Sequence, residues 1–531
     1  MIINLAITSQ LKRMKKTIYL LIIFSTGLAV SCKKSSKSPD PIAPSKVGST
    51  LDLIKDSVYL YAKEDYYWYD ALPTYAQFNP RSFTGTADID ALNNEVNAIS
   101  QYKINPQTKL PYEYYASAPG EAKYSFIDNG EASTALNGVK GDFGFAPIYI
   151  NITTTDLRVK YVYPGSPADL AGIKRGYRIT AINNNTNFSY DGSTGPNVQF
   201  VINAYSNSNT ITMTLVKFDG TSMNVSLNAT NYAVNPVLYS KVYDEGNGHK
   251  VGYIVFNSFT SDAVADPRLN TAFNDFSANG VTDLVVDLRY NGGGYVSTAE
   301  YLANLIVPAA KSGTLMYNTY FNDVLTNNKE SLLANQVRVD PTTHQSYNYA
   351  QFDYSVAGNA VKFSKVGSFN VSRVFFIITG STASASELTI NNLIPVMDVK
   401  FIGSTSYGKP VGFFDVDINK YQLYIPEFET KNSANQGGYY TGMTPGSSAY
   451  PGIQDLDDVT KEFGDPSEKL LAYALNYVKT GTYTVPTQGV ASTNNIGLRS
   501  FSISQANSAA RALEKNQFSG MIFNKPLKKR K

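Results

Sequence analysis

The sequence predicts an α/β multidomain protein with three folded parts: an N-terminal helical domain, a β-rich domain and an α/β domain. Three observations lead to this fold class. Apolar residues recur at helical spacing in the first part and alternate with polar residues from about residue 130. From about residue 248, apolar strands alternate with helical segments, which favours a mixed or parallel sheet covered by helices. The length of 531 residues agrees with several domains.

Composition excludes several classes of function. The chain has 46 Lys and Arg against 43 Asp and Glu, and its net charge of +3 implies no nucleic-acid or polyanion partner. Its single cysteine, Cys32, cannot form an intramolecular disulfide. Because no Cys/His cluster is present, we expect no metal and no cofactor.

The N-terminus has the layout of a secretory signal peptide, which we assign to residues 1–32. A basic pair beginning at Lys15 precedes an apolar run over 18–30, and small residues lead into Cys32. The run is shorter than the roughly 20 residues that a membrane span needs. We expect Met14 to be the true start, because the residues before it add nothing that a signal needs.

Residues 28–32, Leu-Ala-Val-Ser-Cys, resemble a bacterial lipobox. The resemblance implies that Cys32 is lipidated and anchors the protein in a membrane, since each buried CH₂ contributes about 0.8 kcal/mol. No acidic residue follows directly, which in Bacteroidota-type lipoproteins implies a cell-envelope position facing the periplasm. A plain secretory signal or an uncleaved anchor is the alternative. Residues 33–47, rich in Lys, Ser and Pro, predict a flexible tether.

Residues 48–125 are predicted to form the helical domain. Leu51, Ile54 and Val58 recur at helical spacing, and Asp88 is expected to cap a second helix. The apolar stripes of these helices suit a packed core better than a binding surface.

Residues 130–235 are predicted to form the β-rich domain. Residues 157–162 alternate as a strand, a turn and a short helix that ends at Gly172 follow, and residues 176–183 form the next strand. This order closely resembles the core of a PDZ domain of bacterial processing proteases. A small β-domain that only packs is the alternative.

The segment Gly141-Asp142-Phe143-Gly144-Phe145 resembles the PDZ loop whose backbone N–H groups hold the C-terminal carboxylate of a peptide. The resemblance implies that Gly141, Phe143, Gly144 and Phe145 bind peptides, which PDZ domains take up as an added strand.

The α/β domain is predicted over residues 240–482, with buried-type strands at 250–256, 284–288 and 374–378. Residues 483–531 are predicted to be a C-terminal tail, and we expect its basic end to be solvated.

Two turns of small residues follow strands of this domain, where α/β proteins place ligand sites. The second turn contains three candidate nucleophiles, Ser381, Ser384 and Ser386, and opens a helix whose N-terminus carries free N–H groups. For Ser384 the neighbouring N–H of Ala385 could hold an oxyanion. A second donor is available in the Asn-Gly-Gly-Gly turn, from Gly292 or Gly293. Lys409 offers an amine that could act as a base.

Three segments resemble the signature blocks of family S41, the C-terminal processing or tail-specific serine proteases: Val-Asp-Leu-Arg-Tyr-Asn-Gly-Gly-Gly at 286–294, Gly-Ser-Thr-Ala-Ser-Ala-Ser-Glu at 380–387 and Ser-Tyr-Gly-Lys at 406–409. The resemblance implies a ClpP/crotonase-like domain. The distance of 25 positions to Lys409 agrees with the family and selects Ser384 as nucleophile.

The resemblance implies that Lys409, as a neutral amine, deprotonates Ser384, which attacks the substrate and forms an acyl-enzyme. A free lysine has a pKa near 10.4, so burial away from carboxylates has to lower it. One position departs from the family. Phe413 stands where a glutamine often orients the amine. The two histidines, His249 and His344, lie outside all three blocks.

These residues lead to one functional hypothesis and two alternatives. The first is a lipid-anchored serine endopeptidase that cleaves envelope proteins or peptides and selects accessible C-termini through its PDZ domain. The second, motivated by Phe413, is a non-catalytic peptide-binding scaffold that keeps the S41 fold. The third is an acyl hydrolase that uses the same serine and lysine on small molecules.

Overall fold

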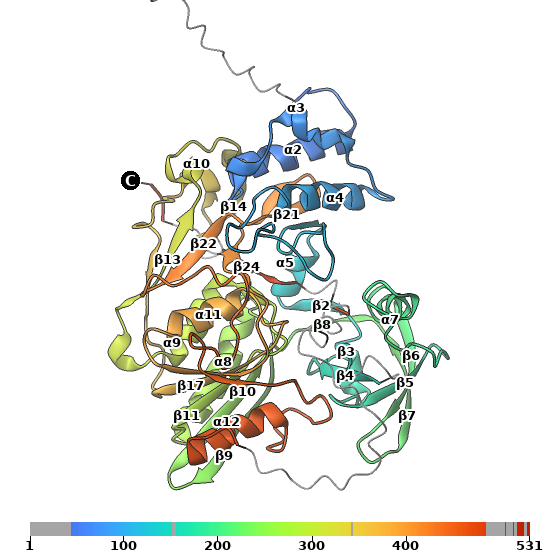
Figure 1. Cartoon of the computed structure of the whole chain (residues 1–531), viewed down its shortest axis with the longest axis vertical. Coiled ribbons are helices and arrows are strands. Elements are labelled where there is room, and N and C mark those ends of the chain that lie inside the picture. Colours follow the sequence, from blue (N-terminus) through green and yellow to red (C-terminus); the bar gives the residue numbers. More distant parts are fainter. Residues whose placement is uncertain are drawn as a thin grey trace, which may run out of the picture. The chain divides into compact units, whose positions relative to one another are not determined.

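The computed structural model describes residues 44–150, 156–340, 343–484, 505, 513–514, 518–524 and 528–530 (Figure 1). It divides into two units, of which one comprises residues 1–48 and 73–79, with the short helix α3 (Tyr75–Phe78), and the other comprises 49–72 and 80–531. The predicted signal peptide, Cys32 and most of the tether lie outside the described residues. Where the chain is described, no helix combines the length and the apolar character that crossing a membrane requires.

Two helices of the second unit form the predicted N-terminal helical region: α2 (Thr50–Glu64) and α4 (Asp88–Ser100), with the short helices η1 (Tyr69–Ala71) and η2 (Pro80–Ser82) between them. Ser49 caps α2, since its side chain accepts the N–H of Asp52 at 3.1 Å. The predicted cap of the second helix is one residue off. The N-cap is Ala87, and Asp88 is the first helical residue.

The β-rich domain is a five-stranded antiparallel sheet in the order β3-β4-β5-β6-β7 (Figure 1). The predicted sequence of strand, turn, short helix and strand is confirmed. Ser166 caps α6, and Gly172 follows that helix with φ +78°. The elements are α5 (Glu131–Leu136), β2 (Val139–Asp142), β3 (Phe145–Tyr149), β4 (Leu157–Val162), α6 (Pro167–Leu170), β5 (Arg178–Ile182), α7 (Pro196–Ser206), β6 (Thr210–Val216), β7 (Ser222–Asn228) and β8 (Thr230–Ala233), which pairs with β2.

A six-stranded sheet in the order β23-β18-β17-β11-β10-β9 forms the centre of the α/β domain. The strands from β10 to β23 are parallel, and β9 adds an antiparallel edge. All three predicted strands are present. The strands are β9 (Val237–Gly246), β10 (His249–Phe256), β11 (Asp283–Asp287), β17 (Arg373–Ile378), β18 (Asp398–Gly403) and β23 (Gly452–Gln454).

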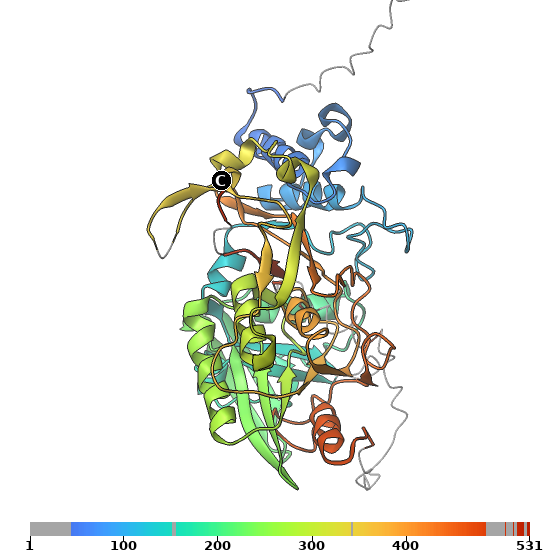
Figure 2. The same ribbon diagram turned by 90° about the vertical axis from the view of Figure 1, so that its left-hand side faces the viewer.

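Helices cover both faces of this sheet. Figure 2 shows the green helix α8 (Asp262–Ala278) on one side of the strands and the red helix α12 (Lys469–Thr480) on the other. Alternate residues of β10 explain this arrangement. Val251 and Tyr253 pack in one core with α12, whereas Gly252 faces the ring of Phe276 from α8. Helices α9 (Val296–Ile306) and α11 (Ala385–Leu393) follow the strands β12 and β17 along the chain.

Smaller sheets surround the ends of the central strands. They comprise β1 (Phe126–Asp128), β21 (Tyr421–Tyr424) and β20 (Val416–Ile418); β16 (Ala360–Lys362), β13 (Leu315–Phe321), β22 (Phe428–Asn432) and β19 (Val411–Gly412); β14 (Val337–Val339) and β15 (Ser346–Asn348); and β12 (Gly293–Tyr295) and β24 (Gly520–Ile522). Short helices complete the domain: η3 (Ala309–Lys311), α10 (Asp323–Thr326), η4 (Leu332–Asn335) and η5 (Tyr349–Gln351).

Lys528 and Lys529 of the basic end are exposed, as expected, but the apolar part of the tail that precedes them is buried at 521 and 522. Met521 and Ile522 lie in β24 with 0% and 3% of their surface exposed. Arg530 donates its backbone N–H to the carbonyl of Gln351 at 3.0 Å. The apolar run Met-Ile-Phe at 521–523 explains the difference, because these side chains gain stability when they are buried.

Candidate active site

Three loops meet at one edge of the central sheet. They follow β11, β17 and β18, which are neighbouring parallel strands that end at Asp287, Ile378 and Gly403. The carboxyl ends of parallel strands are the usual place for ligand sites in α/β domains. All three S41-like blocks of the sequence lie on these loops, so the fold brings together residues that are far apart along the chain.

Ser384 occupies the turn between β17 and α11. It is the N-cap of α11 and has φ +57° and ψ −106°, a backbone conformation that non-glycine residues rarely adopt. The residue is fully buried. Within the part of the chain that the structure describes, its Oγ has no hydrogen-bond partner. A strained turn with an unpaired hydroxyl is the arrangement expected for a nucleophile.

Asn291 connects the glycine turn to the serine turn. Its side chain donates to the carbonyl of Phe256 and accepts the N–H of Gly293, both at 2.9 Å. Its carbonyl accepts the N–H of Ala383 and the hydroxyl of Ser386, both at 3.0 Å. Ser386 is therefore engaged in structure, and the two turns are fixed to each other.

The predicted oxyanion donors lie along this junction. Ala385 is the first residue of α11, so its N–H is not used by the helix. A Cβ on Gly293 would lie 3.1 Å from the nitrogen of Ala385, which shows how closely the two turns approach. Gly293 has φ +109° and its own N–H is bound by Asn291. Gly292 lies against a different segment, since a Cβ there would lie 2.3 Å from the carbonyl oxygen of Phe518.

Lys409 has 0% of its surface exposed, and no carboxylate of the described residues lies within ion-pair distance of it. Its Nζ donates to the carbonyl of Ser519 at 2.6 Å and of Tyr124 at 3.4 Å. Burial lowers the pKa of Lys409 well below its usual value of 10.5, against the opposing charges of Glu113 and Glu387. The buried, unpaired lysine that the sequence argument requires is thus present.

The structure also shows what stands in place of the usual glutamine. The Nζ of Lys409 lies 3.8 Å from the centre of the Phe413 ring. The ring cannot accept a conventional hydrogen bond, but its face attracts an ammonium group. Two backbone carbonyls orient the amine instead, and one of them, Tyr124, comes from the region that the sequence assigns to the helical domain.

Glu387 holds the two candidate catalytic segments together. Its Oε2 accepts the backbone N–H of both Ser384 and Lys409 at 2.8 Å. Its Oε1 accepts the N–H of Gly408 at 2.7 Å and the hydroxyl of Ser406 at 2.5 Å. Burial raises the pKa of Glu387, and these four donors oppose that shift. The sequence analysis assigned it no role, although its place three residues after the candidate nucleophile was a signal.

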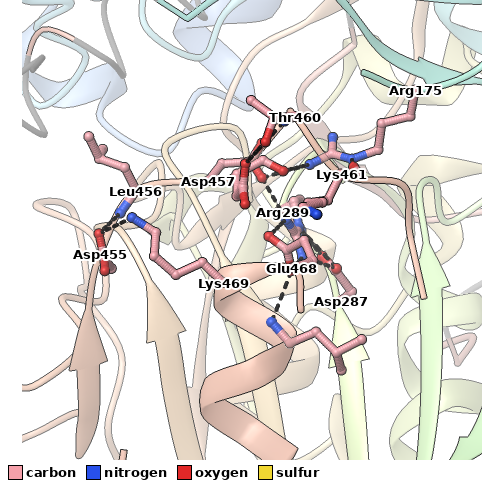
Figure 3. Close-up of polar contacts among 12 residues, drawn as sticks. Arg175, Asp287, Arg289, Asp455, Leu456, Asp457, Thr460, Lys461, Glu468 and Lys469 are labelled. Carbon is pink, nitrogen blue, oxygen red and sulfur yellow. Dashed lines mark hydrogen bonds and ion pairs between the residues drawn. The ribbon is translucent and has the colours of Figure 1, made fainter. Parts of the chain in front are cut away.

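A second cluster of charged side chains surrounds Arg289, which precedes Asn291 by two residues (Figure 3). Arg289 contacts Asp287 at 2.6 Å, Glu468 at 2.9 Å and Asp457 at 2.5 Å. Arg175 of the β-rich domain reaches the same Asp457 at 2.8 Å. Burial alone would lower the pKa of Arg289, but the three carboxylates raise it well above its usual value. This cluster connects the β-rich domain to the base of the site.

The predicted peptide-binding loop lies at the start of β3, which is an edge strand. Gly141 belongs to β2, and Gly144 donates its N–H to the side chain of Asp142 at 2.8 Å. Phe143 and Phe145 are buried in the core of the domain. Any contact of this loop with a peptide would therefore use its backbone, and the edge of β3 has the geometry for an added strand.

Comparisons with known proteins match two regions of this chain to protein families. Residues 250–442 match the model of peptidase family S41, and residues 158–210 match the model of the PDZ domain. The chain contains an S41 peptidase domain and a PDZ domain. All three loops of the candidate site lie within the matched S41 region.

Relatives of the S41 domain include a "Carboxyl-terminal-processing protease" of Picosynechococcus, which is 33% identical over 164 residues, 30% of this chain and 36% of that protein. A "Probable CtpA-like serine protease" of Staphylococcus aureus (strain bovine RF122 / ET3-1) is 27% identical over 241 residues, 44% of this chain and 46% of that protein. This chain thus spans less than half the length of these relatives. A crystal structure of a candidate S41 protease from Bacteroides fragilis aligns with a TM-score of 0.50 and 23% identity, covering 80% of this chain and 97% of that one, which supports the fold.

Proposed function

We propose that this protein is a serine endopeptidase in which Ser384 is the nucleophile and Lys409 the general base. One observation carries the proposal. A single oxygen of Glu387 accepts the backbone N–H of both residues, so the segments that carry the hydroxyl and the buried amine are held against each other. Both residues lie at the carboxyl ends of neighbouring parallel strands, where the fold places its chemistry.

The reaction follows from the groups present. The neutral amine of Lys409 takes the proton of the Ser384 hydroxyl while Oγ forms a bond to the scissile carbonyl carbon. The tetrahedral intermediate then collapses, the C–N bond breaks, and the ammonium returns its proton to the departing amine. A water molecule, deprotonated by the same amine, cleaves the acyl-enzyme and regenerates Ser384. No metal or cofactor is needed for these steps.

The oxyanion of the intermediate requires N–H donors close to the nucleophile. The N–H of Ala385 at the start of α11 supports this role, aided by the partial positive charge of the helix N-terminus. The glycine turn supplies the second donor in our proposal, because Gly293 approaches the serine turn closely. The N–H of Gly292 is the candidate here, since Asn291 accepts the N–H of Gly293, which would have to exchange that bond for the oxyanion. Removing one such donor typically lowers kcat by about 10²–10³-fold.

The substrate in this proposal is an unfolded protein or peptide with an accessible C-terminus. The edge strand β3 and its preceding loop, with Gly141 and Gly144, support uptake of a C-terminal peptide by the PDZ domain. The signal-like N-terminus and Cys32 support a lipid-anchored position in the cell envelope facing the periplasm, where such substrates would be envelope proteins. Nucleic acid has no part in the proposal, given the nearly neutral charge.

A non-catalytic peptide-binding scaffold remains the second candidate, because Lys409 contacts two backbone carbonyls here. A single experiment separates the candidates. The chain from Gly48 onward is incubated with an unstructured protein substrate, beside its Ser384→Ala and Lys409→Ala variants. We expect the parent to cut the substrate and both variants to lose this activity. Peptide binding without cleavage would support the scaffold, and ester hydrolysis without proteolysis would support an acyl hydrolase.

A further inference from the structure

The C-terminal segment 518–524 lies inside the candidate active site as an extended strand. Its central part, β24, pairs in parallel with β12, so that Gly520 stands opposite Gly293. The N–H of Gly520 donates to the carbonyl of Gly292 at 2.9 Å. On its other side, Met521 accepts the N–H of Phe413 at 2.8 Å. The segment is therefore hydrogen-bonded to the glycine turn on one side and to the loop after Lys409 on the other.

At Gly520, strand β24 packs so closely against its neighbours that a side chain would not fit. A Cβ on Gly520 would lie 2.8 Å from the ring of Phe413 and 2.6 Å from the ring of Phe518, and a Cβ on Gly293 would lie 2.1 Å from the carbonyl oxygen of Gly520. Only glycine satisfies both approaches. Further along the strand, the ring of Phe523 lies 4.3 Å from the ring of Phe428, centre to centre.

The same segment contacts the catalytic groups. The carbonyl of Ser519 accepts a hydrogen bond from the Nζ of Lys409 at 2.6 Å, while the Oγ of Ser384 has no partner among the described residues. The amine of the proposed base is thus hydrogen-bonded to the tail and not to the hydroxyl of the nucleophile. Ser384 and Lys409 both have 0% of their surface exposed, although the substrate of a protease has to reach them.

A preceding part of the tail is held by the PDZ domain. Leu513 has 2% of its surface exposed and belongs to the apolar core of that domain. The hydroxyl of Tyr205 on α7 donates to the Leu513 carbonyl, and Glu514 pairs with the buried Lys160 of β4. Glu514 also accepts the hydroxyl of Ser381 at 2.8 Å, next to the serine turn. The tail therefore contacts both the peptide-binding domain and the peptidase domain.

We propose that segment 518–524 is an internal inhibitor that occupies the peptide-substrate site and remains uncleaved. The proposal rests on the proposed function, because it assigns the occupant of that same site. A tethered segment acts at an effective concentration on the order of millimolar, so it excludes a dilute external peptide without binding tightly. An external substrate enters once the segment leaves, and the amine of Lys409 then becomes available to Ser384.

The test compares two ways of removing the segment with a matched control. A chain that ends at Gln517 lacks the segment. In the full chain, Gly520→Pro removes the N–H that binds Gly292 and adds a ring where no Cβ fits. The control is Lys529→Ala, which alters an exposed side chain of the same tail. We expect at least about tenfold faster cleavage of an unstructured protein by both altered chains, and an unchanged rate for the control, since the competent fraction rises.

A binding measurement separates this inference from the proposed function. A fluorescent heptapeptide with the sequence of residues 518–524 is titrated onto each chain carrying Ser384→Ala, which requires no catalysis. We expect at least about tenfold tighter binding to both altered chains than to the full chain and the Lys529→Ala control. If this difference appears while no chain cuts protein, the segment still occupies the peptide site, and it is the proposed function that fails.

Three results would overturn the inference. The first is equal peptide affinity for all chains, and the second is a full chain that cuts protein as fast as the shortened one. The third is mass spectrometry showing that the full chain, but not its Ser384→Ala variant, loses its own tail at 518–524, because the segment would then be a substrate. In the second and third cases the proposed function itself remains supported.

Discussion

Arg289 and Lys409 are both fully buried basic side chains, and their surroundings differ in one respect. Arg289 is enclosed by three carboxylates, which raise its pKa well above the usual value despite burial. Lys409 has no carboxylate at ion-pair distance among the described residues, and burial lowers its pKa well below 10.5. The carboxylates thus favour the charged form of Arg289, whereas burial favours the neutral form of Lys409.

This contrast explains why only one of the two residues can act as a general base. A guanidinium that is paired on all sides fixes neighbouring loops, and here Arg289 joins the end of β11 to Asp457 and to Glu468 at the start of α12 (Figure 3). A neutral amine has a free lone pair and can accept a proton from a hydroxyl. Burial is the same for both residues, so the position of the carboxylates decides the role.

The largest expected effect comes from making the reactive base permanently charged. Lys409→Arg keeps a long basic side chain, but a guanidinium stays protonated at all accessible pH values. We expect proteolysis to fall by about 10²–10⁴-fold, the usual contribution of a general base. Arg289→Lys, the reverse exchange, should retain measurable turnover. Both rates are measured in whichever chain, full or ending at Gln517, shows turnover, and an active Lys409→Arg enzyme would exclude Lys409 as the base.

The second effect tests the paired cluster. Arg289→Met leaves Asp287 and Glu468 buried without a cation, while Asp457 keeps its contact with Arg175, and we expect the free energy of unfolding to fall by about 3–5 kcal/mol. Arg373→Met is the matched control, since the side chain of Arg373 is 31% exposed and pairs with the exposed Asp398 as well as with Asp283. The control should change stability by about 1 kcal/mol or less. Urea unfolding at pH 7 measures both, and equal losses would remove the distinction between the two sites.

The fold was largely predictable because its signals are local. The apolar runs of β10, β11 and β17 and the strand–turn–helix order around α6 depend on neighbouring residues, and the structure has all of them. The C-terminal tail was not predictable in this way. Its apolar residues 521–523 are few, polar residues surround them, and the partner strand β12 lies more than 200 positions earlier in the chain. Periodicity carries no information about such pairing.

The residues of the candidate site likewise fall into those that local motifs predict and those that depend on contacts between distant parts of the chain. Ser384, Ala385 and Lys409 lie in short motifs, and the family resemblance located them. The backbone carbonyl of Tyr124 accepts a hydrogen bond from the amine of Lys409. Because every residue carries a carbonyl, the sequence at this position gives no signal of that contact. The carboxylate of Glu387 stood inside the motif, but its four donors come from residues that meet only in the folded chain.

The third effect is a dependence of stability on pH. The unfolded chain carries Lys409 protonated below about pH 10.4, whereas the native pKa is lowered. Between these two values the unfolded state binds more protons, so stability rises with pH by about 1.4 kcal/mol per unit. Lys409→Met removes this group. We expect the variant to gain stability relative to the parent as pH falls from 10 to 7.

The slope is the decisive readout for Lys409→Met, because the two carbonyls that lose their donor shift stability equally at every pH. Lys329→Met, at an exposed lysine, serves as control and should give a difference that does not vary with pH. Chemical unfolding at several pH values between 7 and 10 supplies both curves. A flat difference for Lys409→Met would mean that the native amine is charged, as Arg289 is.

The smallest effect concerns Phe413, whose ring face favours the charged form of Lys409 although the ring carries no charge. The ring face lies 3.8 Å from Nζ, and such contacts contribute about 0.5–2 kcal/mol to a cation. Phe413→Leu removes the ring, so the pKa of Lys409 should fall further. We expect the acidic limb of kcat/KM to move to lower pH by about 1 unit or less, at 1.4 kcal/mol per unit.

The chain ending at Gln517 is used, because the ring also contacts the tail. Phe401→Leu, in β18, is the matched control and should leave the limb in place. A limb that moves to higher pH would show that the ring excludes water from the amine more than it attracts the ammonium.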